Sequence, residues 1–349
     1  MIKIFYPAQF FDANVRGSWM ELLRSKDRSA RGSKTADDLA LQNGISWVDK
    51  PEDADMLLVP MDWAYYYKQK SQGKVLQWAN GWKNKIPVIS QSNGDHGITV
   101  ADGIWQFRSN IYASKDNRYQ FATPPFFPDP LVANFQQNEI AVRHYKEVPV
   151  IGFCGQSIST PYKRIKDILR VSFLNVLHLV GANYWDTHKI MSTSHLREKV
   201  LRTIEKSSLQ TNFIRRAKYR AGASTPEQRE KTTLEYFKNQ QDSDYIVCVR
   251  GGGNFSVRFY ETLAMGRIPV FINTDCKLPL ENNIEWEKHA VWVEEEEIQD
   301  IAEKIMAFHE KLGEDGFRAL QQHNRKLWEA NMTLSSFYLQ ALNEIVKQS

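Results

Sequence analysis

The sequence is poor in cysteine and lacks any cysteine pair with metal-ligand spacing. Its 349 residues include three cysteines, Cys154, Cys248 and Cys276, which lie far apart in the chain. A disulfide framework or a structural zinc site needs more cysteines at short, regular spacing. The sequence therefore excludes a disulfide-stapled domain and a zinc finger, and it fits a reducing compartment.

Long apolar runs and an excess of charge of one sign are also missing. No apolar stretch approaches the roughly 20 residues of a membrane-spanning helix, and residues 2–6 resemble a strand rather than the start of a signal peptide. The 45 basic and 41 acidic residues give a net charge of +4, which is too even to attract nucleic acid through bulk charge. We expect a cytoplasmic protein with no transmembrane span and no nucleic-acid partner; peripheral association with a membrane stays open.

One local cluster of basic residues stands out against this even charge. It consists of Arg215, Arg216, Lys218 and Arg220. A solvated helix face or loop is the favoured interpretation of such a cluster, and a patch for an anionic substrate or a membrane surface is the alternative.

Short apolar runs alternate with helical patterns along most of the chain. Seven runs are bounded by turn residues and are typical of parallel strands buried on both faces. They are residues 2–6, 55–60, 86–90, 149–155, 245–249, 268–272 and 290–293. Residues 163–177 and 259–265, and the stretches from 298 and from 334, have apolar side chains at helical spacing. The pattern predicts an α/β protein.

A group of closely spaced prolines interrupts this alternation. They are Pro124, Pro125, Pro128 and Pro130. Because proline disfavours regular helix, we place a linker or an extended edge segment from there to about Lys146. The chain exceeds the usual size of one domain. We therefore expect a first domain over residues 1–145, a second over 146–330, and a carboxy-terminal helix in residues 331–349 that packs back toward the first.

A glycine-rich turn follows the predicted strand that ends at Val249. It consists of Arg250, Gly251, Gly252, Gly253 and Asn254. Glycines let the backbone approach a ligand closely, and the helix that begins near Ser256 offers free N–H groups and the positive end of its dipole. Such a turn can hold a diphosphate.

Charged residues in the following helix extend this prediction. Arg250 and Arg258 can form bidentate bonds with phosphate oxygens. Glu261 lies three residues after Arg258 on nearly the same helix face, where it can accept hydrogen bonds from ribose or sugar hydroxyls. The alternative is a plain strand–turn–helix with Ser256 as the helix cap and solvated arginines. The pattern is neither a P-loop nor a GxGxxG fingerprint.

These residues resemble the signature of the exostosin-like glycosyltransferases. The matching elements are Arg250-Gly251, Ser256, Arg258-Phe259, Glu261, Gly266, Ile268-Pro269-Val270, Leu278-Pro279 and residues 284–286. Weaker matches precede them at residues 54–60, 93–97 and 123–125. Arg267 stands where the family commonly has cysteine, and Leu280 stands where it has phenylalanine.

The resemblance implies a GT-B fold, in which two Rossmann-like domains face each other across a cleft. It implies an inverting transfer from a nucleotide-sugar donor, with a UDP-sugar favoured, to a glycan acceptor in cell-surface polysaccharide synthesis. Residues 1–145 would form the acceptor side, and residues 146–330 would bind the nucleotide sugar. We expect no cofactor and no metal, because arginines and a helix end can neutralise the diphosphate. The pairs Asp53/Asp55 and Asp242/Asp244 precede strands and so lie away from the expected site.

An inverting transfer also needs a base that removes the proton of the acceptor hydroxyl. Asp95 and His96 follow the predicted strand 86–90 at its carboxyl end, where a side chain faces the cleft. We expect one of them to be the base, without a choice between them; a turn aspartate and a structural histidine are the alternative. An aromatic cluster, Trp63, Tyr65, Tyr66 and Tyr67, is equally consistent with a sugar platform and with core packing.

Three other functions stay open from the sequence. A non-catalytic nucleotide- or glycan-binding module would keep Arg258 and Glu261 but would need no base. A GDP-fucose-dependent fucosyltransferase would use the same turn for another donor. An epimerase of GT-B shape would release a free nucleotide sugar.

Overall fold

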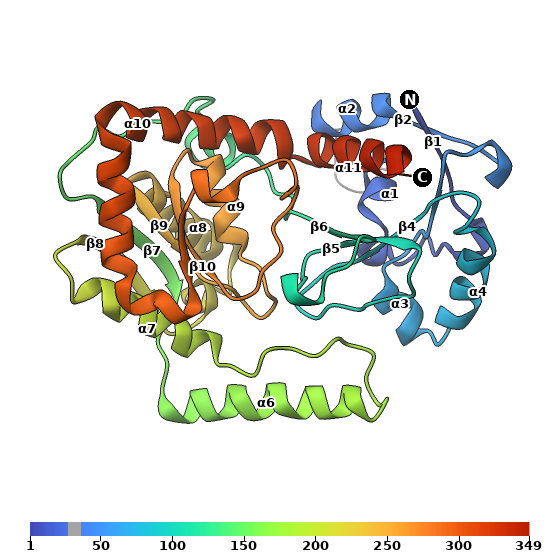
Figure 1. Ribbon diagram of the computed structural model, residues 1–349, viewed down its shortest axis with the longest axis horizontal. Coiled ribbons are helices and arrows are strands. Elements are labelled where there is room, and N and C mark those ends of the chain that lie inside the picture. Colours follow the sequence, from blue (N-terminus) through green and yellow to red (C-terminus); the bar gives the residue numbers. More distant parts are fainter. Residues whose placement is uncertain (27–35, 349) are drawn as a thin grey trace.

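The computed structural model describes residues 1–26 and 36–348, which form two α/β units side by side (Figure 1). Each unit is built on one sheet in which every strand pair is parallel. This is the GT-B type of arrangement, so the predicted fold class is confirmed. None of the described helices is long and apolar enough to cross a bilayer.

The first unit contains six strands in the order β2-β1-β3-β4-β5-β6. The strands are β1 (Ile2–Phe5), β2 (Ile45–Trp47), β3 (Met56–Leu58), β4 (Val88–Ser92), β5 (Ile104–Arg108) and β6 (Gln120–Ala122). The helices of this part of the chain are α1 (Glu21–Lys26), α2 (Ala36–Gly44), α3 (Trp63–Lys68), α4 (Gln72–Trp82) and α5 (Pro130–Phe135). Every residue of β3, β4 and β5 is buried, as expected for parallel strands covered on both faces.

The second unit contains five strands in the order β11-β10-β9-β7-β8. The strands are β7 (Val150–Gln156), β8 (Gln210–Arg216), β9 (Tyr245–Cys248), β10 (Ile268–Asn273) and β11 (Val291–Glu294). The helices are α6 (Pro161–Leu179), α7 (Thr193–Glu205), α8 (Pro226–Gln241), α9 (Val257–Ala264) and α10 (Ile301–Asn331). The strand order reverses between β7 and β9, which places a crevice at their carboxyl ends.

Each of the seven predicted apolar runs contains a strand, but four strands were missed. Strands β2 and β6 have three residues each, too few for a periodic signal. Strand β5 carries Gln106 in its buried middle, where the side-chain amide donates to the carbonyl of Ile98 at 2.6 Å. Strand β8 is the polar edge of its sheet and starts with exposed residues. These strands were not predicted because they are short or contain polar residues, and they form through pairing with neighbouring strands.

The proline-rich segment is more ordered than the predicted linker. Helix α5 lies inside it and begins at Pro130, because proline is tolerated in the first helical turn. The side chain of Asp129 caps this helix by accepting the N–H of Leu131 at 3.0 Å, and it also binds Arg325 of α10 through both oxygens. The expectation that these prolines exclude helix was therefore wrong at Pro130.

The carboxy-terminal helix α11 (Leu334–Gln348) lies against the first unit, beside α2 (Figure 1). Its Tyr338 ring is 5.0 Å from that of Phe107 in β5. Asp37 of α2 caps the helix by accepting the N–H groups of Leu334 and Ser335 at 2.9 and 3.0 Å. Helix α10 reaches this side after a bend at Gly313, whose φ of 59° needs glycine. The domain boundaries at residues 145 and 330 stay predictions.

Arg267 stabilises the junction between the proline-rich segment and the second unit. Its guanidinium is buried and donates to the carbonyls of Ala141 and Gln241 at 2.9 Å each and of Gln240 at 3.2 Å. Burial lowers the pKa of this guanidinium to about 10, so it stays charged at neutral pH. The arginine at this position, where the resemblance leads us to expect cysteine, therefore has a structural role: it supplies donors to three backbone carbonyls.

We predict that Arg267→Met lowers the free energy of unfolding by about 3 kcal/mol, because several buried carbonyls lose their donor. Chemical denaturation measures this change. The matched control is Arg318→Met, which replaces an exposed arginine of α10 and should cost about 0.5 kcal/mol or less. Equal losses in both variants would contradict the role given to Arg267.

Candidate functional site

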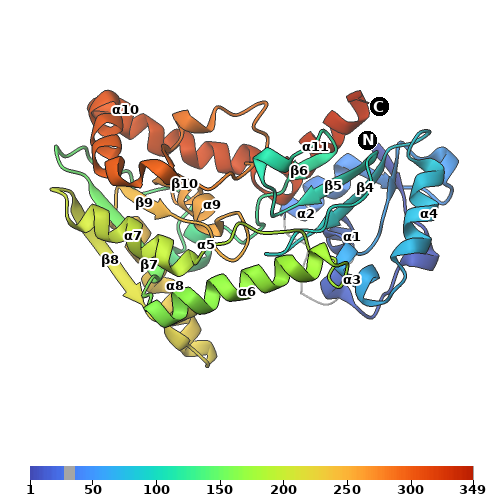
Figure 2. The ribbon, with the colours of Figure 1, turned by 60° about the horizontal axis from the view of Figure 1, so that its bottom comes forward.

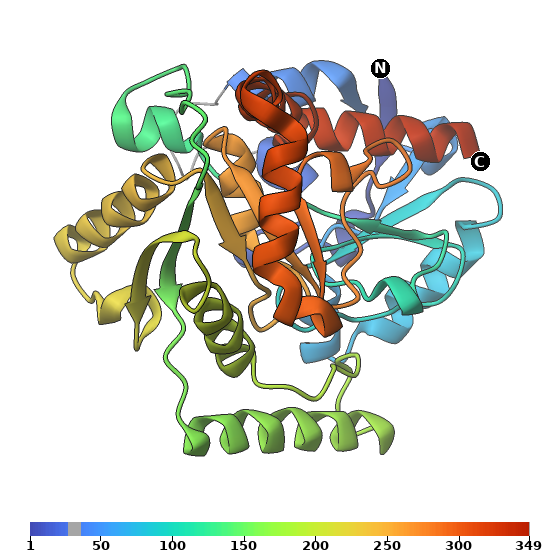
Figure 3. The same ribbon diagram turned by 60° about the vertical axis from the view of Figure 1, so that its left-hand side comes forward.

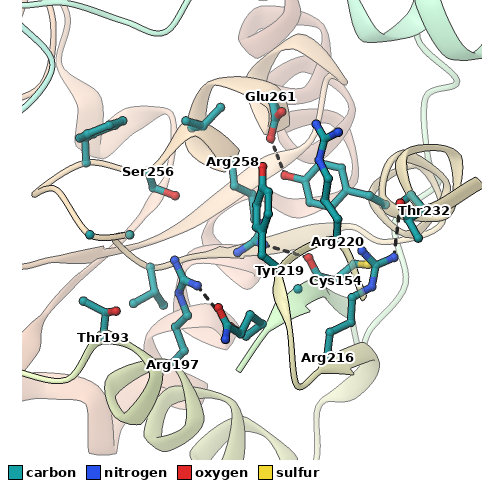
Figure 4. Close-up of a pocket in the computed structure, with 18 of the residues that line it drawn as sticks. Cys154, Thr193, Arg197, Arg216, Tyr219, Arg220, Thr232, Ser256, Arg258 and Glu261 are labelled. Atoms are coloured by element: carbon teal, nitrogen blue, oxygen red, sulfur yellow. Dashed lines mark hydrogen bonds between the residues drawn. The ribbon is translucent and has the colours of Figure 1, made fainter. Parts of the chain in front are cut away.

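A cavity of about 650 Å³ opens at the crevice of the second sheet (Figure 4). Its floor consists of Cys154, Gly155 and Gln156 at the end of β7 and of Val249 after β9. Its walls come from α7, α8 and the start of α9, and from Asp95 of the first unit. The cavity therefore lies at the point where the strand order reverses and where the two units meet.

The glycine-rich turn forms one side of this cavity through Gly251 and Gly252. The turn passes so close to the first unit that a Cβ on Gly252 would lie 2.5 Å from a carboxylate oxygen of Asp95. Helix α9 begins at Val257, and Ser256 at its start makes no side-chain capping bond and lines the cavity. The N-terminal end of α9, with its positive dipole, is therefore directed at the cavity.

Two half-buried arginines extend toward one another across the cavity, Arg197 from α7 and Arg258 from α9 (Figure 4). Arg197 donates to the carbonyls of Arg250 at 2.8 Å and Gln156 at 3.2 Å, and Arg258 donates to that of Cys154 at 2.9 Å. Burial, and then the nearby Arg258, lower the pKa of Arg197 to about 10. Among the described residues, the Nε atoms of both arginines are buried without a hydrogen-bond partner.

Glu261 of α9 is, with Asp95, one of two acidic residues that the structure describes in the lining of the cavity. Its carboxylate accepts a hydrogen bond of 2.5 Å from the hydroxyl of Tyr236 in α8. The guanidinium of Arg258 lies over the Tyr236 ring, 5.6 Å from its centroid. Burial raises the pKa of Glu261, while the Tyr236 bond and the Arg258 charge oppose this rise. Within the described chain, the other carboxylate oxygen of Glu261 makes no direct hydrogen bond. It can accept one from a hydroxyl group in the cavity.

The basic cluster that stood out in the sequence divides between two environments. Arg216 and Arg220 line the cavity, whereas Arg215 pairs with Glu205 on the surface at 3.2 Å. Arg216 also pairs with Glu235 and donates to the carbonyl of Thr232 at 3.3 Å. Thus two members of the cluster line the cavity, and their contact with an anionic substrate stays a prediction.

Three predicted donor-binding residues lie behind the wall of the cavity. Arg250 donates to the Tyr112 hydroxyl through two nitrogens at 3.3 Å each and lies over that ring. The fully buried amide of Asn254 donates to the carbonyl of Asp275 at 2.7 Å. Gly253 packs on the Asp95 backbone, to which an added Cβ would come within 3.0 Å. These residues hold the turn in place, and their contact with a donor stays a prediction.

The structure separates the two candidate bases. Asp95 is exposed and lines the cavity. His96 instead contacts the segment between α6 and α7: its Nδ1 lies 3.2 Å from Nε2 of His188, and its ring is 5.5 Å from that of Trp185. His188 could not be predicted from the sequence, because its partner His96 is 92 positions away and no motif surrounds it.

Both histidines are held toward their neutral forms. Burial lowers the pKa of His96, although Asp95 opposes this shift. Burial, and then the charges of His96 and Arg250, lower the pKa of His188 to about 4. Arg250 and His188 both contact Tyr112, so the histidine pair borders the turn.

The aromatic cluster after β3 serves mainly as core. Trp63 and Tyr66 are buried in the first unit, and Tyr65 donates to Asp12 at 2.8 Å. Tyr67 alone turns toward the second unit, where it stacks on Tyr184 at 4.8 Å. The packing interpretation is therefore right for Trp63 and Tyr66.

The two Asp-x-Asp pairs lie at the amino ends of strands, as expected. Asp55 accepts the N–H of Lys3 at 2.8 Å. Asp244 accepts the N–H of Val150 at 2.7 Å and pairs with Arg143. Within the described residues, no group of three histidine, cysteine, aspartate or glutamate side chains could hold a metal ion. One aspartate of each pair is thus held by structural bonds.

Comparison with protein families decides where this chain belongs. The model of the Exostosin GT47 domain matches residues 33–308. The chain belongs to the exostosin GT47 family. The resemblance expected from the Arg250–Glu285 region is therefore confirmed over most of the chain.

Individual relatives in the exostosin GT47 family match over shorter segments. Exostosin-1 of Drosophila melanogaster is 33% identical over 104 residues, which are 29% of this chain and 13% of that protein. A probable glucuronosyltransferase 47 A of Physcomitrium patens is 37% identical over 71 residues, 20% of this chain and 16% of its own. The chain thus matches less than a fifth of the length of these relatives. Among solved structures, Anabaena HepE in complex with UDP aligns over 100% of both chains with a TM-score of 0.38 and 10% identity.

We predict that the stability of this exostosin-family protein depends on pH through His188. Its folded pKa of about 4 lies below the ordinary histidine value of 6.5, so between these values the unfolded chain binds the proton more strongly. The free energy of unfolding should therefore fall as pH falls from 6.5 to 4, by at most about 3 kcal/mol from this group. Chemical denaturation at several pH values measures the slope.

The variant His188→Gln should have a shallower slope than the wild type in this window. His323→Gln, which removes an exposed histidine of α10, is the control and should keep the wild-type slope. An unchanged slope in His188→Gln would show that His188 is not held neutral.

Proposed function

We propose that the protein is an inverting glycosyltransferase that moves a sugar from a nucleotide diphosphate sugar, with a UDP-sugar favoured, to a glycan hydroxyl. The transfer would take place in the cytoplasm, as a step in the synthesis of a cell-surface polysaccharide. The transferred sugar is a hexose or a pentose, since relatives are named glucuronosyltransferase and β-1,4-xylosyltransferase.

One observation carries the proposal: two half-buried arginines, with buried Nε atoms, face each other at the N-terminal end of helix α9. Arg197 and Arg258 are like charges with unpartnered Nε donors, an arrangement that is unfavourable unless an anion lies between or beside them. A diphosphate supplies the charge and the acceptors. The same groups would stabilise the departing nucleoside diphosphate during transfer, which gives them a catalytic use.

The position of Glu261 and Asp95 supports the rest of the assignment. Glu261 lies beyond Arg258, where it can accept hydrogen bonds from the ribose hydroxyls of a nucleotide. Asp95 lies on the opposite side of the glycine-rich turn and belongs to the other unit. A carboxylate there can take the proton of an acceptor hydroxyl as that hydroxyl attacks the anomeric carbon. We therefore assign the base to Asp95, and we assign to His96 the positioning of the segment that carries Asp95.

The first test is calorimetric titration of the protein with UDP, GDP, CMP and ADP in the absence of metal. One nucleoside diphosphate should bind, and Arg197→Gln should weaken that binding at least about tenfold because one charge-assisted contact is lost. Arg202→Gln is the matched control, because Arg202 lies on the same helix α7 and pairs with Glu198 on the surface. Glu261→Gln should weaken nucleoside diphosphate binding but leave pyrophosphate binding unchanged.

Two outcomes would decide against the donor site. Binding of none of the four nucleotides by the folded protein would remove the proposal. Equal affinities of Arg197→Gln and Arg202→Gln for the nucleotide would show that the diphosphate does not bind in this cavity.

The second test concerns the base. Asp95→Asn should keep nucleotide affinity and lower the transfer rate at least about a hundredfold, because proton removal is lost. His96→Gln should cost less, and chelation of divalent metal should leave the wild-type rate unchanged. Transfer assays with candidate UDP-sugars, and analysis of the anomeric configuration of the product, measure both points. Unchanged transfer by Asp95→Asn would refute the assignment, and nucleotide binding without any transfer would favour a non-catalytic module.

A further inference from the structure

Helix α6 presents an apolar stripe to solvent rather than to the core. Figures 1, 2 and 3 show it lying along one side of the molecule, away from both sheets, and none of its 19 residues is buried. The exposed apolar side chains recur every three or four residues. They are Tyr162, Ile165, Leu169, Phe173, Val176 and Val180, with Leu179 beside the last. We call them the α6 stripe.

The opposite side of α6 is the side that holds the helix to the protein. Asn175 exchanges two hydrogen bonds with the backbone of His188, at 2.8 and 2.9 Å. Asp167 accepts the hydroxyl of Ser192 at 2.6 Å. Because these polar bonds face inward, the apolar side is fixed outward. An amphipathic helix in a soluble protein normally has the reverse orientation.

Charge distinguishes the partners that could cover the α6 stripe. Lys163, Arg164, Lys166 and Arg170 are the basic residues of the helix, and the last three are exposed. Its one acidic residue, Asp167, is engaged with Ser192 and Ser194. A second copy of α6 would therefore bring no carboxylate to pair with these basic side chains. The partner must supply both negative charge and an apolar layer that can bury the side chains of the α6 stripe.

We propose that α6 binds the surface of an anionic lipid bilayer, with the α6 stripe inserted among the acyl chains and Lys166 and Arg170, which flank the stripe, at the headgroups. The stripe covers 18 residue steps, about 27 Å of helix, and a helix of this kind lies in the plane of the membrane interface. Each basic side chain at such a surface strengthens binding by about fivefold. This inference stands independently of the proposed transfer reaction.

The test is flotation of the full chain with vesicles of phosphatidylcholine containing one quarter phosphatidylglycerol, compared with vesicles of phosphatidylcholine alone. The wild type should bind the anionic vesicles and bind the neutral ones at least about tenfold more weakly. Val176→Asp should reduce binding to anionic vesicles at least about tenfold, because a charge replaces an inserted side chain. Lys166→Gln with Arg170→Gln should reduce it by about twentyfold.

The chain provides a matched control for the apolar substitution. Val132→Asp changes the same residue type on α5, where the side chain is 50% exposed, compared with 54% for Val176. It should bind vesicles like the wild type. Because both valines are exposed, both variants should fold, which thermal unfolding checks.

A probe on the stripe gives a second readout. The three native cysteines are buried, so Phe173→Cys can be labelled selectively with an environment-sensitive fluorophore. Its emission should shift to the blue when anionic vesicles are added.

Three results would overturn the proposal. One is absence of binding to the anionic vesicles at low salt, and another is equal binding by Val176→Asp and Val132→Asp. The third is a wild-type dimer in solution that Val176→Asp makes monomeric while vesicle binding is lacking, because a second copy would then cover the α6 stripe.

Discussion

The geometry of the cavity depends on how the glycine-rich turn is held between the two units, and Asn254 is the centre of that contact. Its backbone N–H donates to the side chain of Asn110 at 2.7 Å, and its side chain donates to the carbonyls of Ile111 and Asp275 at 3.3 and 2.7 Å. All these groups are buried, so removing one partner would leave others unsatisfied. The turn cannot move away from Asp95 without breaking this network.

This constraint explains why the glycines follow one another. A side chain at Gly252 would collide with the Asp95 carboxylate, and one at Gly253 would collide with the Phe255 ring and the Asp95 backbone. The contact between the units therefore sets both the position of the acidic side chain and the absence of side chains beside it. A site built in this way is assembled from rigid elements, which is the condition for fixed catalytic distances.

Basic side chains gather at two places in the molecule, the cavity and helix α6. Inside, Arg197 and Arg258 line a cavity, and within the described chain each has a buried Nε atom without a hydrogen-bond partner, which favours an anionic ligand. Outside, the basic residues of α6 accompany the outward α6 stripe, which favours an anionic surface. Helix α6 follows β7, whose carboxyl end lines the cavity, and it precedes the segment that carries His188. A membrane bound by α6 would therefore lie close to the elements that form the site.

The sequence by itself determined the α/β class, seven of the strands, and the glycine-rich turn before α9, because buried parallel strands and glycine-rich turns leave local patterns. Only the tertiary structure decided which polar groups face the cavity. Arg197 has no motif, Arg250 and Asn254 turned out to hold the turn, and Asp95 and His96, neighbours in sequence, point to different partners. The outward orientation of α6 was likewise hidden, since periodicity reveals that a helix is amphipathic but not which side the rest of the chain covers. The choices at the cavity depend on contacts between residues far apart in the chain, such as Arg197 with Arg250, 53 positions apart, and Asn254 with Asn110, 144 positions apart. Local sequence carries no information about such contacts.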